Sequence, residues 1–156
     1  MQFNLLGLRP FAIAIAISTV VSAFSAPAFA DFQKTEDAIK YRQSSLSLMG
    51  THFSRIGAVV KGEASFNKED VAKNAAIVNM LSSLPWQGFG PGTESPKALA
   101  SIWSEAPKFK LASDKLQTAT AELNTAAQSG NLDNIKKAFG AVGQACKGCH
   151  DDFRKK

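Results

Sequence analysis

Apolar residues recur at helical spacing in four segments after residue 30, and none of them alternates as a half-buried strand would. The first helix is predicted over about residues 35–60. Its apolar face comprises Ile39, Leu46, Met49, Phe53, Ile56 and Val60. Arg42 occupies the remaining position on this face. A buried guanidinium requires a partner, for which we expect an anionic group.

The second helix is predicted to begin after Asn67, an N-cap residue, and to stop at Pro85. Residues 86–93 contain two large aromatic side chains and three glycines, a composition typical of a loop. Ser95 is expected to cap a short helical turn that Pro96 begins and that reaches Trp103. His52 lies off the apolar face of the first helix, so we expect it at the surface.

The third helix is predicted to carry Pro107 in its first turn and to end at Gly130. The fourth is predicted to begin near Asn131. In both helices the apolar positions repeat every seven residues. The apolar face of the third helix comprises Phe109, Ala112, Leu116, Ala119, Leu123 and Ala126. The apolar face of the fourth comprises Leu132, Ile135, Phe139, Val142, Cys146, Cys149 and Phe153. The pattern predicts an all-α, up-down-up-down antiparallel four-helix bundle with left-handed crossings of about 20°.

The fourth helix carries Cys146-Lys147-Gly148-Cys149-His150, the sequence pattern of a c-type haem attachment site. Two thiols three residues apart lie on one helix face and can add to the two vinyl groups of one haem. His150 can then bind the iron as an axial ligand. Because both cysteines share the apolar face, we predict one covalently bound haem in the bundle core. A haem propionate would supply the anionic partner for Arg42.

Other uses of a Cys-x-x-Cys pair agree less well with this chain. A thioredoxin-like redox pair needs a βαβ setting, which the pattern lacks. A zinc site needs four ligands, but the chain has only two cysteines and one other histidine, His52. A disulfide between Cys146 and Cys149 stays open as an alternative.

Residues 1–30 resemble a cleaved secretory signal peptide. The apolar run at residues 11–21 is too short to span a bilayer, and Ala28-Phe29-Ala30 matches a cleavage pattern. We therefore expect an exported, periplasmic protein that begins at Asp31 and has no membrane anchor after cleavage. Residues 31–156 form one predicted domain with 17 Lys and Arg against 13 Asp and Glu. This mild positive charge suits an acidic redox partner, whereas the lack of a basic cluster argues against nucleic acid.

Over residues 31–156 the chain resembles the cytochrome c′ family, the class II c-type cytochromes. The resemblance rests on Tyr41-Arg42-Gln43, on Leu84-Pro85-Trp86, on residues 89–94, and on the segment from Cys146 to Arg154. It implies that Cys146 and Cys149 hold the haem, with His150 as the proximal iron ligand. It also implies that Arg42 and Gln43 lie near the propionates, that Thr93 and Glu94 line the haem edge, and that Arg154 lies beside the proximal face.

The family resemblance further implies that Leu46 covers the sixth coordination position of the iron. Met49, one turn away, is the rival axial ligand, and methionine also commonly fills cores. Trp86 and Phe89 are expected against the haem edge, the ends of neighbouring helices, or both. Leu46 over the iron predicts five-coordinate haem that binds nitric oxide and carbon monoxide. Met49 on the iron predicts a six-coordinate electron carrier.

The resemblance also implies a homodimer that forms through the first two helices, and a role in nitric oxide binding or scavenging together with electron transfer. A structural or sensory bundle is a third possibility. We do not expect an enzyme, because the sequence shows no general base near the iron. His52, the only candidate, faces away from the apolar side of its helix.

Overall fold

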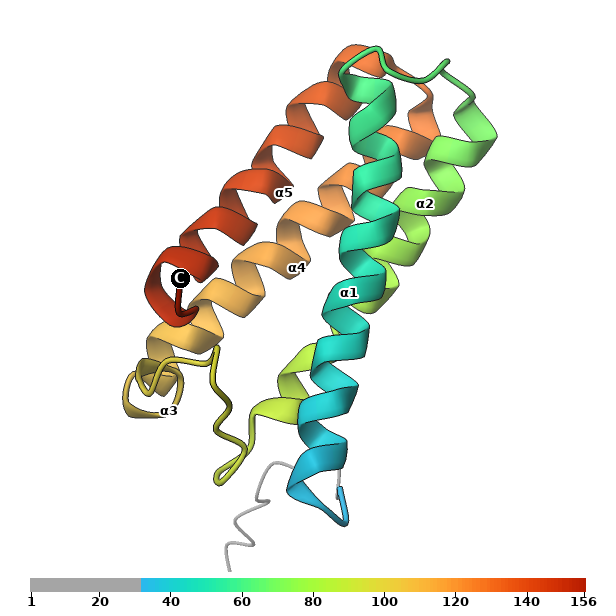
Figure 1. Cartoon of the computed structure of the whole chain (residues 1–156). Helices are drawn as coiled ribbons and strands as arrows, with labels where there is room; N and C mark the ends of the chain where they lie inside the picture. Colours follow the sequence, from blue (N-terminus) through green and yellow to red (C-terminus); the bar gives the residue numbers. More distant parts are fainter. Residues whose placement is uncertain (1–31) are drawn as a thin grey trace, which may run out of the picture.

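The computed structural model describes residues 32–156. The predicted signal peptide, residues 1–30, and the predicted first mature residue, Asp31, lie outside the described residues. Six helical elements follow one another in the described part, as Figure 1 shows: α1 (Thr35–Val60), α2 (Lys68–Leu81), the 3-10 helix η1 (Pro85–Phe89), α3 (Ser101–Ser104), α4 (Ala106–Ser129) and α5 (Leu132–Phe153). Among them, no helix has the length and apolarity to cross a membrane.

The four long helices pack as the predicted bundle. Each of α1, α2, α4 and α5 packs against the next, and α5 returns to α1. The α1–α5 pair is in contact at the end where α1 finishes and α5 begins, with Phe53 and Phe139 stacked at 4.2 Å between ring centroids. Toward the opposite end the two helices diverge, as seen in Figure 1.

Side chains from all four long helices build the core. Its centre contains Ile56, Val78, Leu123 and Ile135, each at most 1 % exposed. Burying a side chain of this size stabilises the fold by about 1.5–3 kcal/mol. The bundle is therefore held mainly by the apolar faces that the sequence pattern indicates.

The predicted helix ends are largely confirmed. The side chains of Asn67 and Asn131 cap α2 and α5, each accepting a hydrogen bond of 3.0 Å from the backbone N–H three residues on. Pro107 lies in the first turn of α4, where its missing N–H is not needed. Gly130 ends α4 with a φ of 73°, in the left-handed region that glycine adopts without strain.

Two predicted boundaries in residues 82–103 are wrong. Helix α2 ends at Leu81, because a proline at position 85 would clash with the Leu81 carbonyl in a continuing helix. The predicted loop begins as the 3-10 helix η1. Ser95 does not cap a helix, since α3 starts only at Ser101. Its hydroxyl accepts a hydrogen bond from Arg42 instead.

Two single positions also differ from the sequence-based expectation. The buried face of α4 ends with Ala127, which is fully buried, whereas Ala126 is only partly buried. The reason is that a straight helix turns every 3.6 residues and drifts from a strict seven-residue repeat. His52 is half-buried rather than at the surface, because its Nδ1 lies 2.8 Å from Asn74 Oδ1 on α2.

Candidate haem site

A cavity of about 460 Å³ lies where α1 and α5 diverge. This volume is within the range of small-molecule and cofactor pockets. Apolar side chains dominate its wall, with basic and polar groups among them. The lining residues are Arg42, Gln43, Leu46, Ser47, Met49, Gly50, Phe53, Val78, Trp86, Phe89, Ser95, Lys97, Ala98, Ile102, Phe109, Leu116, Val142, Cys146, Cys149, His150, Phe153 and Arg154.

Cys146, Cys149 and His150 all line this cavity from the last turns of α5. Both cysteines are free thiols and half-buried. They follow Val142 on the face of α5 that meets the core, as the sequence pattern predicts. The attachment motif therefore borders a largely apolar cavity between helices, where a haem can be held on both faces.

The thiols lack the environment of a redox-active pair. Burial raises the pKa of Cys146, and burial together with the charges of Cys146 and Asp152 raises the pKa of Cys149 to about 11. Reactive Cys-x-x-Cys pairs have lowered pKa values, because the thiolate is the nucleophile. At neutral pH both thiols are protonated, which argues against a thioredoxin-like activity.

The charge state of His150 suits a metal ligand. Burial lowers the pKa of His150, and the positive charge of Arg154 lowers it further, while Asp151 opposes both effects. The neutral imidazole is therefore favoured, and this is the form that binds a metal. Within residues 32–156, no group of three His, Cys, Asp or Glu side chains is placed to hold a bare metal ion.

The C-terminal end of α5, which carries His150, is held by hydrogen bonds to residues 97–101. Backbone hydrogen bonds join Leu99 N–H to the Phe153 carbonyl at 3.1 Å and Lys155 N–H to the Lys97 carbonyl at 3.0 Å. The Ser101 hydroxyl donates to the Asp152 carbonyl at 3.0 Å. This clamp, the hydrogen bonds between residues 97–101 and residues 152–155, could not be predicted from the sequence, because it joins segments more than fifty residues apart.

Arg42 is buried on the cavity wall, with 2 % of its surface exposed. One terminal nitrogen donates to the Gly88 carbonyl at 2.6 Å and to Thr93 Oγ1 at 2.9 Å, and the other donates to Ser95 Oγ at 3.1 Å. The guanidinium carbon lies 4.3 Å from the centroid of the Phe89 ring. Burial lowers the pKa of Arg42, and the Glu94 carboxylate opposes this shift. Neutral acceptors therefore hold the guanidinium at the cavity edge and tie α1 to residues 88–95.

The other residues assigned from the family resemblance divide into two groups. Gln43 and Arg154 line the cavity and are exposed at its mouth. Thr93 and Glu94 do not line it. Thr93 is buried behind Arg42 and donates to the Gly90 carbonyl at 2.7 Å, while Glu94 is exposed. These two residues act on the cavity through Arg42 rather than by contact.

An aromatic wall, formed by Trp86, Phe89, Phe109 and Phe153, lines part of the cavity. Phe109 meets the other three rings at centroid distances of 5.0–5.7 Å, each with its edge toward a face. The Trp86 indole N–H donates to the Ser82 carbonyl at 2.6 Å, so the polar atom of this ring is satisfied. Trp86 and Phe89 thus line the cavity and also pack against Phe109 near the start of α4, while their contact with a haem edge stays a prediction.

Leu46 and Met49 both line the cavity from α1. Met49 is 7 % exposed and belongs to the bundle core with Ile56 and Val78. Leu46 is only partly buried at the edge of that core. The structure therefore gives Met49 a packing role and leaves Leu46 freer to face the cavity.

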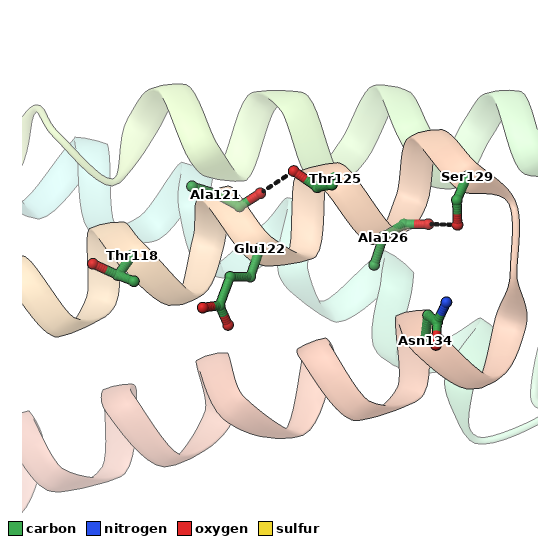
Figure 2. A pocket seen from close by; sticks show the side chains of 7 residues that line it. All are labelled: Thr118, Ala121, Glu122, Thr125, Ala126, Ser129 and Asn134. Atoms are coloured by element: carbon green, nitrogen blue, oxygen red, sulfur yellow. Dashed lines mark hydrogen bonds between the residues drawn. The ribbon is translucent and has the colours of Figure 1, made fainter.

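A second hollow, of about 600 Å³, lies between α4 and α5 outside the bundle. Figure 2 shows its lining residues: Thr118, Ala121, Glu122, Thr125, Ala126, Ser129 and Asn134. All except Ala126 are exposed, so this hollow is an open groove. The Thr125 and Ser129 hydroxyls donate to carbonyls of their own helix, and Glu122 is the only ionisable residue of the seven. We assign no chemistry to this groove.

The residues around the first cavity fit a covalently held haem. Two thiols and a neutral imidazole project from one wall, apolar and aromatic side chains form the others, and three basic groups, Arg42, Lys97 and Arg154, line the same space. Basic groups in the wall of an otherwise apolar pocket match a largely apolar macrocycle that carries carboxylates. Lys97 and the apolar Ile102 were missed from the sequence, because no periodic pattern covers the irregular segment before α4.

Comparisons with known proteins agree with this site. The family model of Cytochrome C′ matches residues 37–154. The cytochrome c′ of Alcaligenes xylosoxydans xylosoxydans is 48 % identical over 125 residues, covering 80 % of this chain and 98 % of the relative. The cytochrome c′ of Rubrivivax gelatinosus is 45 % identical over 128 residues, covering 80 % and 99 %.

Solved structures give the same result. The crystal structure of cytochrome c′ from Rubrivivax gelatinosus superposes with a TM-score of 0.78 at 44 % identity, covering 80 % of this chain and 100 % of that chain. A leucine-to-alanine mutant of cytochrome c prime from Alcaligenes xylosoxidans, in complex with nitric oxide, superposes with a TM-score of 0.78 at 47 % identity, covering 81 % and 99 %. The chain therefore belongs to the cytochrome c′ family, whose members bind one covalent haem c.

Proposed function

We propose that this protein is a periplasmic cytochrome c′ with five-coordinate haem, which binds nitric oxide and carbon monoxide. When bound, the haem supplies the iron that coordinates the diatomic ligand. Cys146 and Cys149 would hold the haem, and His150 would be the protein ligand to its iron. Arg42 and Gln43 would lie near its propionates, and Arg154 would lie beside its proximal face.

The observation that carries this proposal is the difference between Leu46 and Met49. Met49 packs into the bundle core, whereas Leu46 lies at the core edge and lines the cavity. Leu46 has no atom that can bind iron, so it would cover the coordination position without filling it. A ligand must then push this side chain aside, and rearranging a packed apolar side chain costs about 1–3 kcal/mol.

The relatives support ligands of this class. Structures of cytochrome c prime from Alcaligenes xylosoxidans include nitric oxide complexes and a carbon monoxide complex of variants in which one leucine is replaced. An apolar distal wall has no hydrogen-bond donor for bound dioxygen, so it favours ligands that need little polar help. Binding of nitric oxide would allow scavenging or buffering of this gas, and an exchange of electrons with an acidic partner protein is compatible with the basic groups at the mouth.

We also propose export and self-association. Export is supported by the cleavage pattern at Ala28-Phe29-Ala30, and by the haem attachment itself, which keeps an exported cofactor from diffusing away. A homodimer through α1 and α2 is supported by two exposed apolar side chains on these helices, Leu48 and Met80, which are 52 % and 60 % exposed.

The alternative is a six-coordinate electron carrier in which Met49 binds the iron. It is favoured only by the presence of Met49 on the cavity wall. The two functions differ in the spin state of the ferric protein, which an optical spectrum reports directly.

Two variants decide between these functions. Leu46→Ala should tighten carbon monoxide binding by roughly ten- to a hundredfold, because each 1.4 kcal/mol corresponds to about tenfold in affinity. Met49→Leu should leave the ferric spectrum high-spin and unchanged. A low-spin wild type that becomes high-spin in Met49→Leu would overturn the gas-binding proposal and leave the electron carrier.

A further inference from the structure

We propose that Gly50 is the port through which diatomic ligands pass between solvent and the distal side of the cavity. This inference rests on the proposed function, because it concerns access to the same site.

One edge of α1 borders both the cavity and solvent. Gln43, Ser47 and Gly50 are spaced three and four residues apart, so they lie on one side of the helix. All three line the cavity and all three are exposed. The neighbouring positions Leu46 and Met49 also line the cavity but are at least partly buried. This edge of α1 therefore forms one side of the mouth, and Gly50 is the only one of its three exposed positions without a side chain.

Neither packing nor backbone geometry requires glycine at position 50. Glycine at position 57 makes room for Phe139, whose ring carbon would lie 3.1 Å from an added Cβ. Glycine at position 88 makes room for the Ala38 carbonyl, which would lie 2.6 Å from an added Cβ. A Cβ at Gly50 would meet no atom within 4 Å, and the residue has ordinary helical geometry in the middle of α1.

Glycine is among the least favourable residues in a helix interior. Four helix glycines of the described residues, at positions 50, 140, 143 and 148, are uncrowded in this way, and of these Gly50 alone lines the cavity. The missing side chain leaves an opening one turn from Leu46, the residue proposed to cover the iron. Leu46, Met49 and Phe53 surround this opening with apolar groups. An opening bordered by apolar side chains suits an uncharged diatomic molecule and disfavours a hydrated ion.

A port is recognised by its kinetics. Filling it raises the barrier for ligands moving in and out by the same amount, so both rate constants fall together while the affinity stays constant. Because displacement of Leu46 would itself slow binding, the measurement belongs in the Leu46→Ala background, where passage through the protein limits the rate.

The experiment compares Gly50→Trp with Gly140→Trp, both in the haem-loaded Leu46→Ala protein. Gly140 is the matched control, an exposed glycine inside α5 whose added Cβ also meets nothing within 4 Å and which does not line the cavity. Flash photolysis gives the association rate constant for carbon monoxide, and displacement by nitric oxide gives the dissociation rate constant. We expect both constants to fall on the order of tenfold in Gly50→Trp, a barrier increase of about 1.4 kcal/mol. Gly140→Trp should change neither.

Two results would overturn the port. Unchanged rate constants in Gly50→Trp would place the route elsewhere. A changed affinity would mean that Gly50 packs against the bound ligand or haem. Failure of the proposed function is distinguishable, since the Leu46→Ala parent would then bind no carbon monoxide at all.

A second measurement needs no gas. Gly50→Ala and Gly140→Ala should raise the melting temperature by similar amounts, because each adds a methyl group to an uncrowded helix position. Destabilisation by Gly50→Ala alone would show that this glycine is needed for packing, and would also overturn the port.

Discussion

Replacing Arg42 by leucine removes the buried guanidinium that ties α1 to residues 88–95. The Gly88 carbonyl is the acceptor most affected, since Gly88 is buried and its hydrogen bond from Arg42 is 2.6 Å long. A buried acceptor left without a donor costs about 1–3 kcal/mol. The contact between Arg42 and the Phe89 ring contributes about 0.5–2 kcal/mol more.

Several effects limit the total loss. Thr93 keeps its hydrogen bond to the Gly90 carbonyl, and Ser95 is half-buried and can bind water. Leucine also removes the cost of burying a charge at position 42. We therefore expect Arg42→Leu to reduce the free energy of unfolding by about 1–3 kcal/mol, which lowers the melting temperature by roughly 4–11 °C in a domain of this size.

The assay is thermal unfolding of the haem-loaded protein followed by circular dichroism, together with a spectroscopic titration of the midpoint potential. Loss of a positive charge beside the haem favours the ferric state, so the potential should fall in Arg42→Leu. Arg42→Lys keeps the charge but not the planar group that reaches three acceptors, so it should lose stability while retaining most of the potential.

Ser95→Ala is the matched control for the stability effect, because it removes one half-buried acceptor and leaves Arg42 in place. It should cost less than about 1 kcal/mol. A melting temperature of Arg42→Leu within two degrees of wild type would refute the stabilising network. An unchanged midpoint potential would refute the placement of Arg42 beside a haem propionate.

Three further predictions concern Gly88, the Cys149 thiol and the exported form of the protein. Gly88→Ala should destabilise the protein by about 1–3 kcal/mol in thermal unfolding, because the added Cβ would lie 2.6 Å from the Ala38 carbonyl oxygen. A variant as stable as wild type would mean that η1 can move away from α1. The second prediction concerns Cys149, whose pKa is about 11, in haem-free protein that keeps its helical circular dichroism. At pH 8 this thiol should react with iodoacetamide roughly ten- to a hundredfold more slowly than a cysteine peptide. The reaction rate should rise with pH up to the pKa of Cys149, because the thiolate is the nucleophile. A rate equal to that of the peptide would contradict the burial of this thiol. Protein recovered from the periplasm should have the mass of residues 31–156 plus one haem, whereas an intact signal peptide or a mass without haem would contradict the export and attachment proposals.

Much of the site was predictable because it is local in sequence. Cys146, Cys149 and His150 lie close together at the end of one helix, and the two cysteines share a helix face with Val142. Both facts follow from the helical repeat alone. The caps at Asn67 and Asn131 and the stop at Gly130 depend on contacts within four residues of each helix end. The four-helix pattern was predictable for the same reason.

Arg42 shows where sequence reasoning stops. Its place on the apolar face of α1 predicted a buried charge, and the structure buries it. The sequence could not identify its acceptors, because Gly88, Thr93 and Ser95 lie 46–53 residues away in a segment without periodic structure. The family resemblance brought Thr93 to attention, but only the fold places it behind the guanidinium rather than on the cavity wall.

Helix formation, capping and the order of thiols and imidazole along α5 are determined by neighbours in the chain, so the sequence alone establishes them. Tertiary packing decides the rest: the divergence of α1 from α5 that opens the cavity, the clamp of residues 97–101 on the end of α5, and the exposure of Gly50 at the mouth. The physical reason is that these features depend on how helix faces far apart in sequence fit together, and local spacing carries no information about that fit.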